Sequence, residues 1–211
     1  MIPTKKEWIQ ALDDRHGIEF QKKISSTTVA VCGLGGLGSN IAIALARAGI
    51  GKLKLIDFDK VDITNLHRQQ YKINQIGMSK TEALQYNLKE INPYIEIEIH
   101  NVYLNENNAK NVLSGADIIC EAFDNAEAKA NIVNFVLSEM PEKYIVAASG
   151  MAGLESANAI KTRKVSKRFY LCGDEVSDIK DGIGLVSTRV MLCAAHQAHT
   201  VLRIIAEEYE V

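Results

Sequence analysis

The sequence lacks any long apolar stretch. No run approaches the ~20 residues that a helix needs to cross a bilayer, and the first residues form no uninterrupted apolar segment like that of a signal peptide. It also lacks an excess of charge of one sign, because 24 Lys and Arg stand against 26 Asp and Glu, a formal charge of -2. These absences argue against a membrane span and against electrostatic binding to nucleic acid. We expect a cytoplasmic protein that acts on a soluble protein or a small molecule.

Paired cysteines are absent as well. The four cysteines are widely spaced and form no C-x-x-C pair. Cys32, Cys120 and Cys193 lie in apolar patterns that are typical of buried thiols, whereas Cys172 lies near an expected loop. Cysteine chemistry is therefore not predicted for the first three.

Familiar catalytic motifs are missing too. No Ser-His-Asp or Cys-His combination suggests a protein nucleophile, and no G-K-[ST] sequence suggests a P-loop. His196 and His199 lie one helical turn apart without an acidic partner, so we interpret them as structural. A reaction in which the substrate's own carboxylate is the nucleophile remains open. Cations that hold phosphate must then come from elsewhere in the chain.

Glycine follows a clear pattern between residues 28 and 59. An apolar strand at 29–32 leads into Gly33-Leu34-Gly35-Gly36-Leu37-Gly38, then a helix at 39–48 and a second strand at 53–56. This spacing fits the dinucleotide-binding fingerprint. Asp57 and Asp59 follow the second strand, where an acid can hydrogen-bond a ribose hydroxyl. A glycine turn that binds no nucleotide is the alternative, and glycines alone do not identify the nucleotide.

The following residues alternate between strand and helix patterns. We expect helices at 79–91, 105–113 and 126–138 and strands at 95–99, 117–123 and 144–148. Ser79, with Glu82 three residues later, is a capping-box signal for the helix at 79–91. The alternation predicts an α/β fold with a doubly wound, mainly parallel, Rossmann-like sheet. A chain of 211 residues is expected to form a single domain, 1–211.

Both ends of the chain depart from this alternation. We expect a short helix at 3–14 within an N-terminal helix and arm at 1–20, and a lead-in to the first strand at 21–24. Residues 154–162 and 167–171 are expected as antiparallel additions at the C-terminal edge of the sheet. A polar loop at 173–184 and a helix at 186–207 complete the region 150–211.

Polar residues follow several of the expected strands. Ligands of open α/β sheets bind outside the carboxyl ends of the strands. We therefore expect the glycine loop, Asp57 with Asp59, and Asp124 with Asn125 to line one crevice. Asp124 fits a magnesium ligand, since Mg²⁺ is usually held by one or two carboxylates and by phosphate oxygens. Capping of the following helix is the alternative for Asp124.

Two cations lie where bound phosphate requires positive charge. Arg68 belongs to the segment 61–70, which we interpret as an ordered loop lying over the nucleotide. Lys80 falls in the first turn of the helix at 79–91, where positive charge is unfavourable unless an anion lies close. The alternative is that both are ordinary surface cations.

Taken together, these motifs resemble a known family. The glycine loop, Asp57-x-Asp59, Asn65-Leu66-x-Arg68-Gln69, Lys80 and Asp124-Asn125 are similar to the ThiF/MoeB/HesA family, which adenylates ubiquitin-like sulfur carriers and includes the ubiquitin-activating enzymes. The match runs over residues 21–149 and extends more weakly to the last helix. It implies an ATP- and Mg²⁺-dependent adenylyltransferase in which the C-terminal glycine carboxylate of the carrier attacks the α-phosphate. The carrier of the thiamine thiazole pathway is the one we expect.

The resemblance also implies residue roles. The glycine loop supports the phosphates, Asp57 holds the ribose and Asp124 holds magnesium. Asn65, Arg68 and Lys80 contact the triphosphate, and Arg68, Lys80 and Asp124 act in catalysis. The nucleotide-binding set is completed by Asp59, Gln69 and Asn125, and by Arg15 reaching into the neighbouring subunit of a homodimer.

The chain departs from this family in three ways. Many members hold zinc through two C-x-x-C pairs, but Phe169-Tyr170-Leu171-Cys172 keeps one cysteine of the first pair, so we expect no zinc. The loop at 173–184 has no cysteine in the place of the family's reactive one, and Cys172 is a candidate for sulfur transfer. Arg15 is only a rough counterpart of the family's N-terminal arginine.

Other functions fit parts of the pattern. The same fold adenylates other carboxylates, such as a molybdopterin-type carrier or a tRNA-bound group. An NAD-dependent oxidoreductase shares the glycine fingerprint, but it leaves Arg68, Lys80 and Asp124 unexplained and has no evident acid or base for hydride transfer. A nucleotide-binding partner without catalysis is the third possibility, against which the complete set of polar residues argues.

Overall fold

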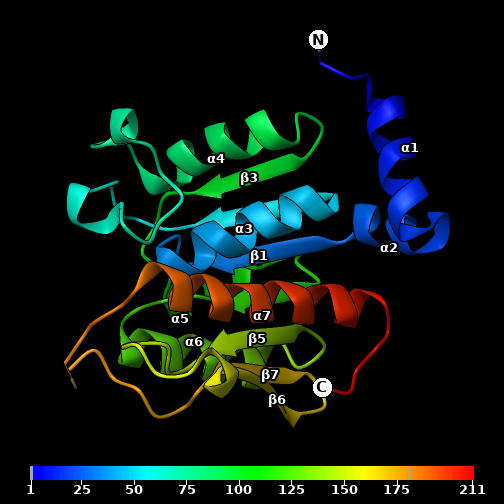
Figure 1. The fold of residues 1–211 in the computed structure, drawn as a ribbon. Helices are drawn as coiled ribbons and strands as arrows, with labels where there is room; N and C mark the ends of the chain where they lie inside the picture. The colour runs from blue at the N-terminus through cyan, green and yellow to red at the C-terminus, as the bar shows by residue number, and fades with distance from the viewer. Residues whose placement is uncertain (1, 181) are drawn as a thin grey trace.

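A seven-stranded sheet forms the centre of the molecule (Figure 1). The computed structural model describes residues 2–180 and 182–211. The strand order is β3-β2-β1-β4-β5-β7-β6; β1 to β5 and β7 run parallel, and β6 pairs antiparallel with β7 at the edge. This is the predicted doubly wound, mainly parallel sheet. The strands are β1 Thr28–Cys32, β2 Lys52–Ile56, β3 Glu96–His100, β4 Ile118–Glu121, β5 Tyr144–Ala148, β6 Lys161–Ser166 and β7 Phe169–Gly173.

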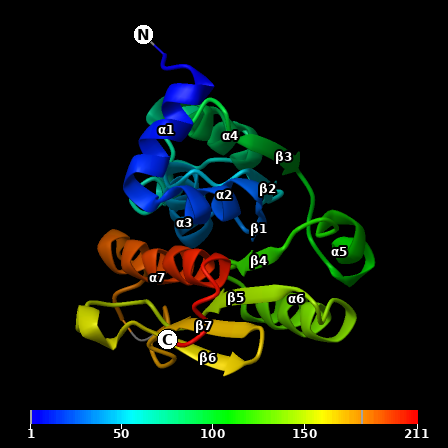
Figure 2. The ribbon, with the colours of Figure 1, turned by 90° about the vertical axis from the view of Figure 1, so that its right-hand side faces the viewer.

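Helices lie on both faces of the sheet (Figure 2). α3, α4 and α7 cover one face, and α5 and α6 cover the other. Short 3-10 turns lie at Ile63–Asn65, Ile73–Gln75 and Ala157–Ala159. The helices are α1 Lys5–His16, α2 Ile18–Ser26, α3 Gly36–Ala48, α4 Lys80–Ile91, α5 Glu106–Val112, α6 Ala126–Glu139 and α7 Ser187–Ile205.

The core consists of two apolar layers, one on each face. Along β1 the side chains alternate between them, with Val29 and Val31 in the cluster that contains α3, α4 and α7 and Ala30 and Cys32 in the cluster that contains α5 and α6. Each fully buried aliphatic side chain contributes roughly 1.5–3 kcal/mol. Burial on both faces explains why the central strands are continuously apolar in sequence.

Two helices near the amino terminus differ from the prediction. Residues 18–26 form α2, where only a lead-in to the first strand was expected at 21–24. α2 is held by tertiary contacts, because Ile24 is fully buried and the side-chain Nε2 of Gln21 donates to the Gly49 carbonyl at 3.3 Å. α3 begins at Gly36, inside the glycine loop and before its predicted start at 39.

The C-terminal strands also differ from the prediction. The strand expected at 154–162 begins instead at Lys161, because the Ser156 hydroxyl accepts from the Asn158 amide at 3.2 Å and turns the chain into the 3-10 turn Ala157–Ala159. β7, expected as an antiparallel addition, pairs parallel with β5 and antiparallel only with β6. The sheet is thus extended by one parallel and one antiparallel strand.

The N-terminal helix α1 lies on the outside of the molecule. Thr4 and Glu7 form a capping box at its start, and none of its residues is buried. Across residues 2–180 and 182–211, no helix combines the length and the apolar composition that crossing a membrane requires.

Candidate functional site

The glycine loop connects β1 to α3 at the carboxyl edge of the sheet. Gly33 has a φ of 88°, and a Cβ atom there would lie 2.8 Å from the carbonyl oxygen of Ala122, so only glycine fits. A Cβ atom at Gly38 would lie 1.8 Å from the Gly33 carbonyl oxygen, which explains the close approach of α3 to the strand. Gly35 precedes α3 without a side-chain cap. The amides of the first turn of α3 are therefore open to an anion.

Asp57 is bonded directly to this loop. Its carboxylate accepts from the amide of Leu34 at 2.6 Å and from the amide of Asp59 at 2.8 Å. The ammonium of Lys80 lies 2.7 Å from Asp59 Oδ2 and 3.9 Å from Asp57 Oδ2. Lys80 is only 6% exposed, so its charge is directed into this corner of the site. Carboxylate oxygens have further lone pairs, which leaves Asp57 able to accept from a ribose hydroxyl.

Arg68 lies against the start of α3. Its Cγ would be 3.4 Å from a Cβ atom at Gly36, and its Nη2 donates to Asn65 Oδ1 at 3.0 Å. Arg68 Nε is buried and has no partner within the described chain, and the same holds for Oε1 of Gln69. Buried polar atoms are normally hydrogen-bonded. A polar ligand bound at this site would supply the hydrogen bonds that these two atoms lack.

Sequence reasoning missed the residues that hold the loop 61–70 in place. The Tyr71 hydroxyl donates to the Leu34 carbonyl at 2.7 Å, and burial raises the pKa of Tyr71. The Gln70 side chain donates to Asn40 Oδ1 at 2.7 Å, and the Gln70 amide donates to the Ser39 hydroxyl at 3.1 Å. These contacts join residues some thirty positions apart, and no local pattern indicates them. The loop is ordered, as predicted.

Asp124 and Asn125 follow β4 and differ in their roles. Asn125, not Asp124, caps α6, since its Oδ1 accepts from the Ala128 amide at 2.8 Å. The alternative that Asp124 is the helix cap is therefore wrong. Asp124 is exposed, and no residue in the described ranges is bonded to it. A single free carboxylate beside a phosphate site suits Mg²⁺, although the described residues contain no cluster of three metal-ligating side chains.

Arg15 lies far from this site in its own subunit. It is exposed near the end of α1, and Leu12 of that helix packs against Gly49 at the far end of α3. In Figure 1 the arrowheads of β3 and β5 point away from α1. The structure therefore does not bring Arg15 to the glycine loop of its own chain.

Cys172 lies in β7, one residue before the strand ends at Gly173 and the chain enters the loop that the sequence predicted. It is fully buried, with Sγ 3.6 Å from the Thr162 hydroxyl. Burial raises the pKa of the Cys172 thiol, so a reactive thiolate is disfavoured here. Cys32, Cys120 and Cys193 are buried as predicted.

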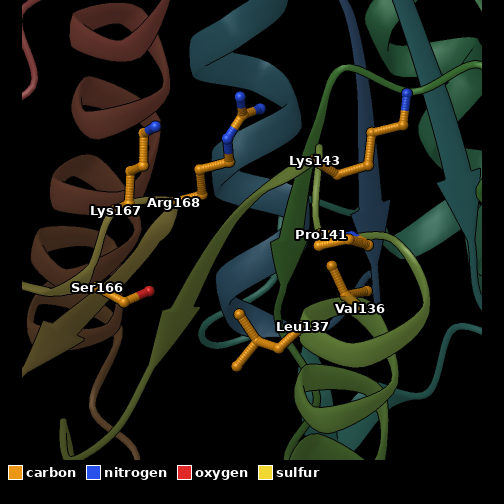
Figure 3. Close-up of a pocket in the computed structure, with 7 residues that line it drawn as sticks. All are labelled: Val136, Leu137, Pro141, Lys143, Ser166, Lys167 and Arg168. Atoms are coloured by element: carbon orange, nitrogen blue, oxygen red, sulfur yellow. The ribbon is translucent and has the colours of Figure 1, made fainter.

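Two cavities lie at the opposite edge of the sheet, near the amino ends of β5 and β7. One of about 390 Å³ separates the end of α6 from the turn between β6 and β7 (Figure 3). The other, of about 260 Å³, shares Lys143 and Arg168 with the first. In Figure 3, Lys143 extends away from Lys167 and Arg168, so these cations do not converge on one point. We assign no ligand to either cavity.

The glycine loop is bonded to Asp57 and has Arg68 packed against Gly36, so these groups lie together at the carboxyl ends of the strands. Residues 10–211 match the ThiF family in sequence. The chain belongs to the ThiF family. This membership confirms the resemblance stated for the motifs between the glycine loop and Asp124, and the fold agrees with it.

Curated relatives of this ThiF-family chain are longer proteins. The adenylyltransferase and sulfurtransferase MOCS3 of Caenorhabditis briggsae is 39% identical over 121 residues, which cover 57% of this chain and 30% of that protein. Ubiquitin-like modifier-activating enzyme 5 of Caenorhabditis elegans is 39% identical over 155 residues, or 68% of this chain and 36% of that protein. The matched part is about a third of each relative.

Solved structures share the fold of this ThiF-family chain. The E. coli tRNA N6-threonylcarbamoyladenosine dehydratase TcdA, in complex with ATP, has a TM-score of 0.85 at 20% identity over 99% of this chain and 98% of that one. E. coli MccB with AMPCPP and MccA has a TM-score of 0.70 at 23% identity over 90% of this chain and 59% of that one. At these identities the likeness concerns the fold.

Proposed function

We propose that this chain uses ATP to adenylate the C-terminal glycine carboxylate of a small ubiquitin-like sulfur carrier protein. The products are a carrier acyl-adenylate and pyrophosphate. Residues 1–211 act in this proposal as a single adenylating domain of a cytoplasmic homodimer, and the region 150–211 faces the carrier.

One observation carries the proposal: Arg68 lies at the open amino end of α3, and a second cation, Lys80, lies beside the acid that is bonded to the glycine loop. Arg68 packs on Gly36 and has an unpaired Nε, and Lys80 is joined to the glycine loop through Asp57. A glycine loop alone suits the pyrophosphate of a dinucleotide. Arg68, which has no acidic partner among the described residues, and the nearby Lys80 favour a more highly charged triphosphate, whose reaction builds up negative charge on the leaving pyrophosphate.

The chemistry needs positioning more than a protein nucleophile. A carboxylate oxygen of the carrier forms a bond to the α-phosphorus, while the bond to the bridging oxygen of the β-phosphate breaks and pyrophosphate leaves with the electron pair. No proton moves in this step. The α3 amides, Arg68 and Lys80 hold the phosphates in line and stabilise the charge on the leaving group.

The free carboxylate of Asp124 fits a magnesium ion bound together with phosphate oxygens. When bound, Mg²⁺ would supply further charge neutralisation at the phosphates. Asp57 orients the ribose, with Asp59 keeping Lys80 turned into the site. Asn65 accepts a hydrogen bond from Arg68 and so holds its guanidinium in place. The unpaired Oε1 of Gln69 accepts a hydrogen bond from the nucleotide in this proposal. Asn125 caps α6 and so fixes the chain next to Asp124.

Within this class, the thiamine-pathway carrier is the substrate that we propose first. A molybdopterin-type carrier and a tRNA-bound carboxylate are the alternatives, and the second is supported by the shared fold of the tRNA N6-threonylcarbamoyladenosine dehydratase TcdA. The absence of zinc remains part of the proposal because a single cysteine stands at 172 where the family has a pair.

Exchange of labelled pyrophosphate into ATP tests the proposal. We expect exchange that depends on the chain, on Mg²⁺ and on one of the candidate carriers. A carrier without its terminal glycine is the matched control and is expected to support none, because the nucleophile is missing.

Thermal unfolding separates this function from a dinucleotide enzyme. A ligand that binds only the native state raises the melting temperature by mass action. ATP with Mg²⁺ is expected to raise it far more than NAD or NADP. Stabilisation by NAD and none by ATP, together with no exchange for any carrier or tRNA substrate, contradicts adenylation.

A further inference from the structure

The geometry points to Glu121 as a positioning residue for Asp124. Glu121 is the last residue of β4, and Asp124 follows three residues later in the sequence. The positioning role rests on the proposed function of Asp124, but the mechanical part of it can be tested without any nucleotide.

Glu121 is buried to an unusual degree for an acid. Its exposed fraction is 0%, and no other Asp or Glu in the described ranges is as fully hidden from solvent. Burial raises the pKa of Glu121, opposed by the charge of Lys129 and by backbone hydrogen bonds from Phe123 and Ala148. A buried carboxylate without partners is strongly unfavourable. The contacts of Glu121 with Lys129 and Phe123 therefore offset the cost of burying its charge.

The bonds of Glu121 hold the chain on both sides of Asp124. Glu121 Oε1 accepts from the Phe123 amide at 2.7 Å, immediately before Asp124. The same carboxylate receives the ammonium of Lys129 at 2.6 and 2.8 Å, from the first turns of α6. The Lys129 amide in turn donates to the Asn125 carbonyl at 3.0 Å, immediately after Asp124. We call these contacts the Glu121 clamp.

The Glu121 clamp leaves one side chain of this turn free. Asn125 is engaged as the cap of α6, while Asp124 remains exposed and unbonded in the described structure. The ring of Phe123 also lies 3.0 Å from the position of a Cβ atom at Gly33, so the clamped segment rests on the glycine loop. The result is a carboxylate presented on a fixed backbone, which saves ordering that backbone when ligand binds.

Hydrogen exchange of the ligand-free protein tests the clamp itself. Glu121→Leu removes the carboxylate that accepts from Phe123 and Lys129, and we expect faster exchange at the Phe123 amide. Glu121→Gln keeps an acceptor for the Phe123 amide and is expected to restore part of the protection. Lys54→Met is the matched control: Lys54 is also buried, at 5% exposed, and donates to the Ser114 carbonyl at 2.6 Å, but it lies on β2.

Two results of this experiment overturn the clamp. One is unchanged protection of the Phe123 amide in Glu121→Leu. The other is an equal loss of protection there in Lys54→Met, which would mean that any buried polar substitution loosens the turn. If Glu121→Leu fails to fold, the double variant Glu121→Leu with Lys129→Met, which leaves no unpaired ammonium beside the buried leucine, takes its place under the same criteria.

A double-mutant cycle tests whether the Glu121 clamp acts through Asp124. In pyrophosphate exchange at saturating ATP, Glu121→Leu is expected to raise the Mg²⁺ concentration for half-maximal rate by about tenfold and to lower kcat. In an Asp124→Ala background, Glu121→Leu is expected to lower the rate by less than about twofold, since coupled residues are not additive. Glu121→Gln is expected to lie between wild type and Glu121→Leu.

Multiplicative losses in the double variant contradict the positioning role and leave Glu121 a residue of the fold alone. Failure of the proposed function gives a different result, because wild-type protein then shows no exchange and the ligand-free hydrogen exchange still reports on the clamp.

Discussion

Arg68 is held in place without having all its polar atoms bonded. Asn65 fixes one end of its guanidinium, and its stem rests on Gly36, yet Nε has no partner. Cys172 is the opposite case. This residue of β7 is fully buried, and its Sγ lies against the hydroxyls of Thr162 on β6 and Thr200 on α7. At the residue scale, one side chain is ready for a ligand and the other is part of the core.

We expect Arg68→Ala to lower pyrophosphate exchange by about two orders of magnitude or more, as for other preorganised electrostatic groups. Cys172→Ala is expected to keep exchange, because acyl-adenylate formation requires no thiol. The measurement is the exchange rate of each folded variant. Arg168→Ala, which changes an arginine at the opposite edge of the sheet, is the matched control.

Loss of exchange in Cys172→Ala, with full exchange in Arg68→Ala, means that the site has been assigned to the wrong residues. If Cys172→Ala keeps exchange but no longer delivers sulfur in a coupled assay, Cys172 becomes the acceptor of the activated carrier. The β7 region would then have to open, because the thiol is buried in the present conformation.

At the scale of elements, a buried ion pair ties the loop 173–184 to its surroundings. Asp174 Oδ1 accepts from the amides of Val176 and Ser177 at 2.9 Å, and Oδ2 is paired with Arg189 at the start of α7. Arg189 also donates to the Ser156 carbonyl at 3.1 Å. Three separate segments of the region 150–211 are therefore joined through one carboxylate and its arginine partner.

The same carboxylate makes stability depend on pH. Burial alone would raise the pKa of Asp174, but hydrogen bonds from Ser177, Val176 and Arg189 outweigh it and lower the pKa from 3.8 to about 2. Because the folded-state pKa is the lower one, ionised Asp174 stabilises the fold above about pH 4. That contribution is lost as the pH falls toward 2.

Asp174→Asn is therefore expected to lower the free energy of unfolding at pH 7 by on the order of 2 kcal/mol. The difference from wild type is expected to shrink between pH 4 and pH 2. Urea unfolding at several pH values measures both quantities. Glu208→Gln, at an exposed position, is the control, and an Asp174→Asn difference that does not change with pH contradicts the linkage.

At the scale of the whole molecule, the site and the N-terminal helix lie at opposite edges of the sheet. None of the residues of α1 is buried, so α1 contributes little to its own domain. Arg15, which we include in the proposed nucleotide site, lies on this helix and not beside the glycine loop of its own chain. This separation favours a homodimer with composite sites.

Removal of residues 1–15 is expected to leave a folded domain that adenylates poorly. Mixing Arg15→Ala with Asp124→Ala is expected to restore part of the lost activity, because a heterodimer then has one site with both residues intact. Native mass spectrometry and pyrophosphate exchange measure assembly and rate. A monomer at working concentration with full activity disproves the composite site.

Local interactions determined much of this protein from its sequence alone. The strand, glycine loop and helix around Gly33, the cap at Ser79 and the strand at 144–148 all depend on residues within a few positions of each other. The order of these elements was enough to predict a doubly wound sheet and to place the acids and cations at its carboxyl edge.

Only the tertiary structure decided the features that join distant segments. The hydrophobic periodicity of the sequence does not indicate three of these features. They are the contact of α2 with Gly49, the complete burial of Cys172, and the capping of α6 by Asn125 in place of Asp124. Glu121 is the plainest case, since a single acid in an apolar strand is visible in the sequence but its partners are not. Packing selects such contacts among many alternatives that local preference leaves equal.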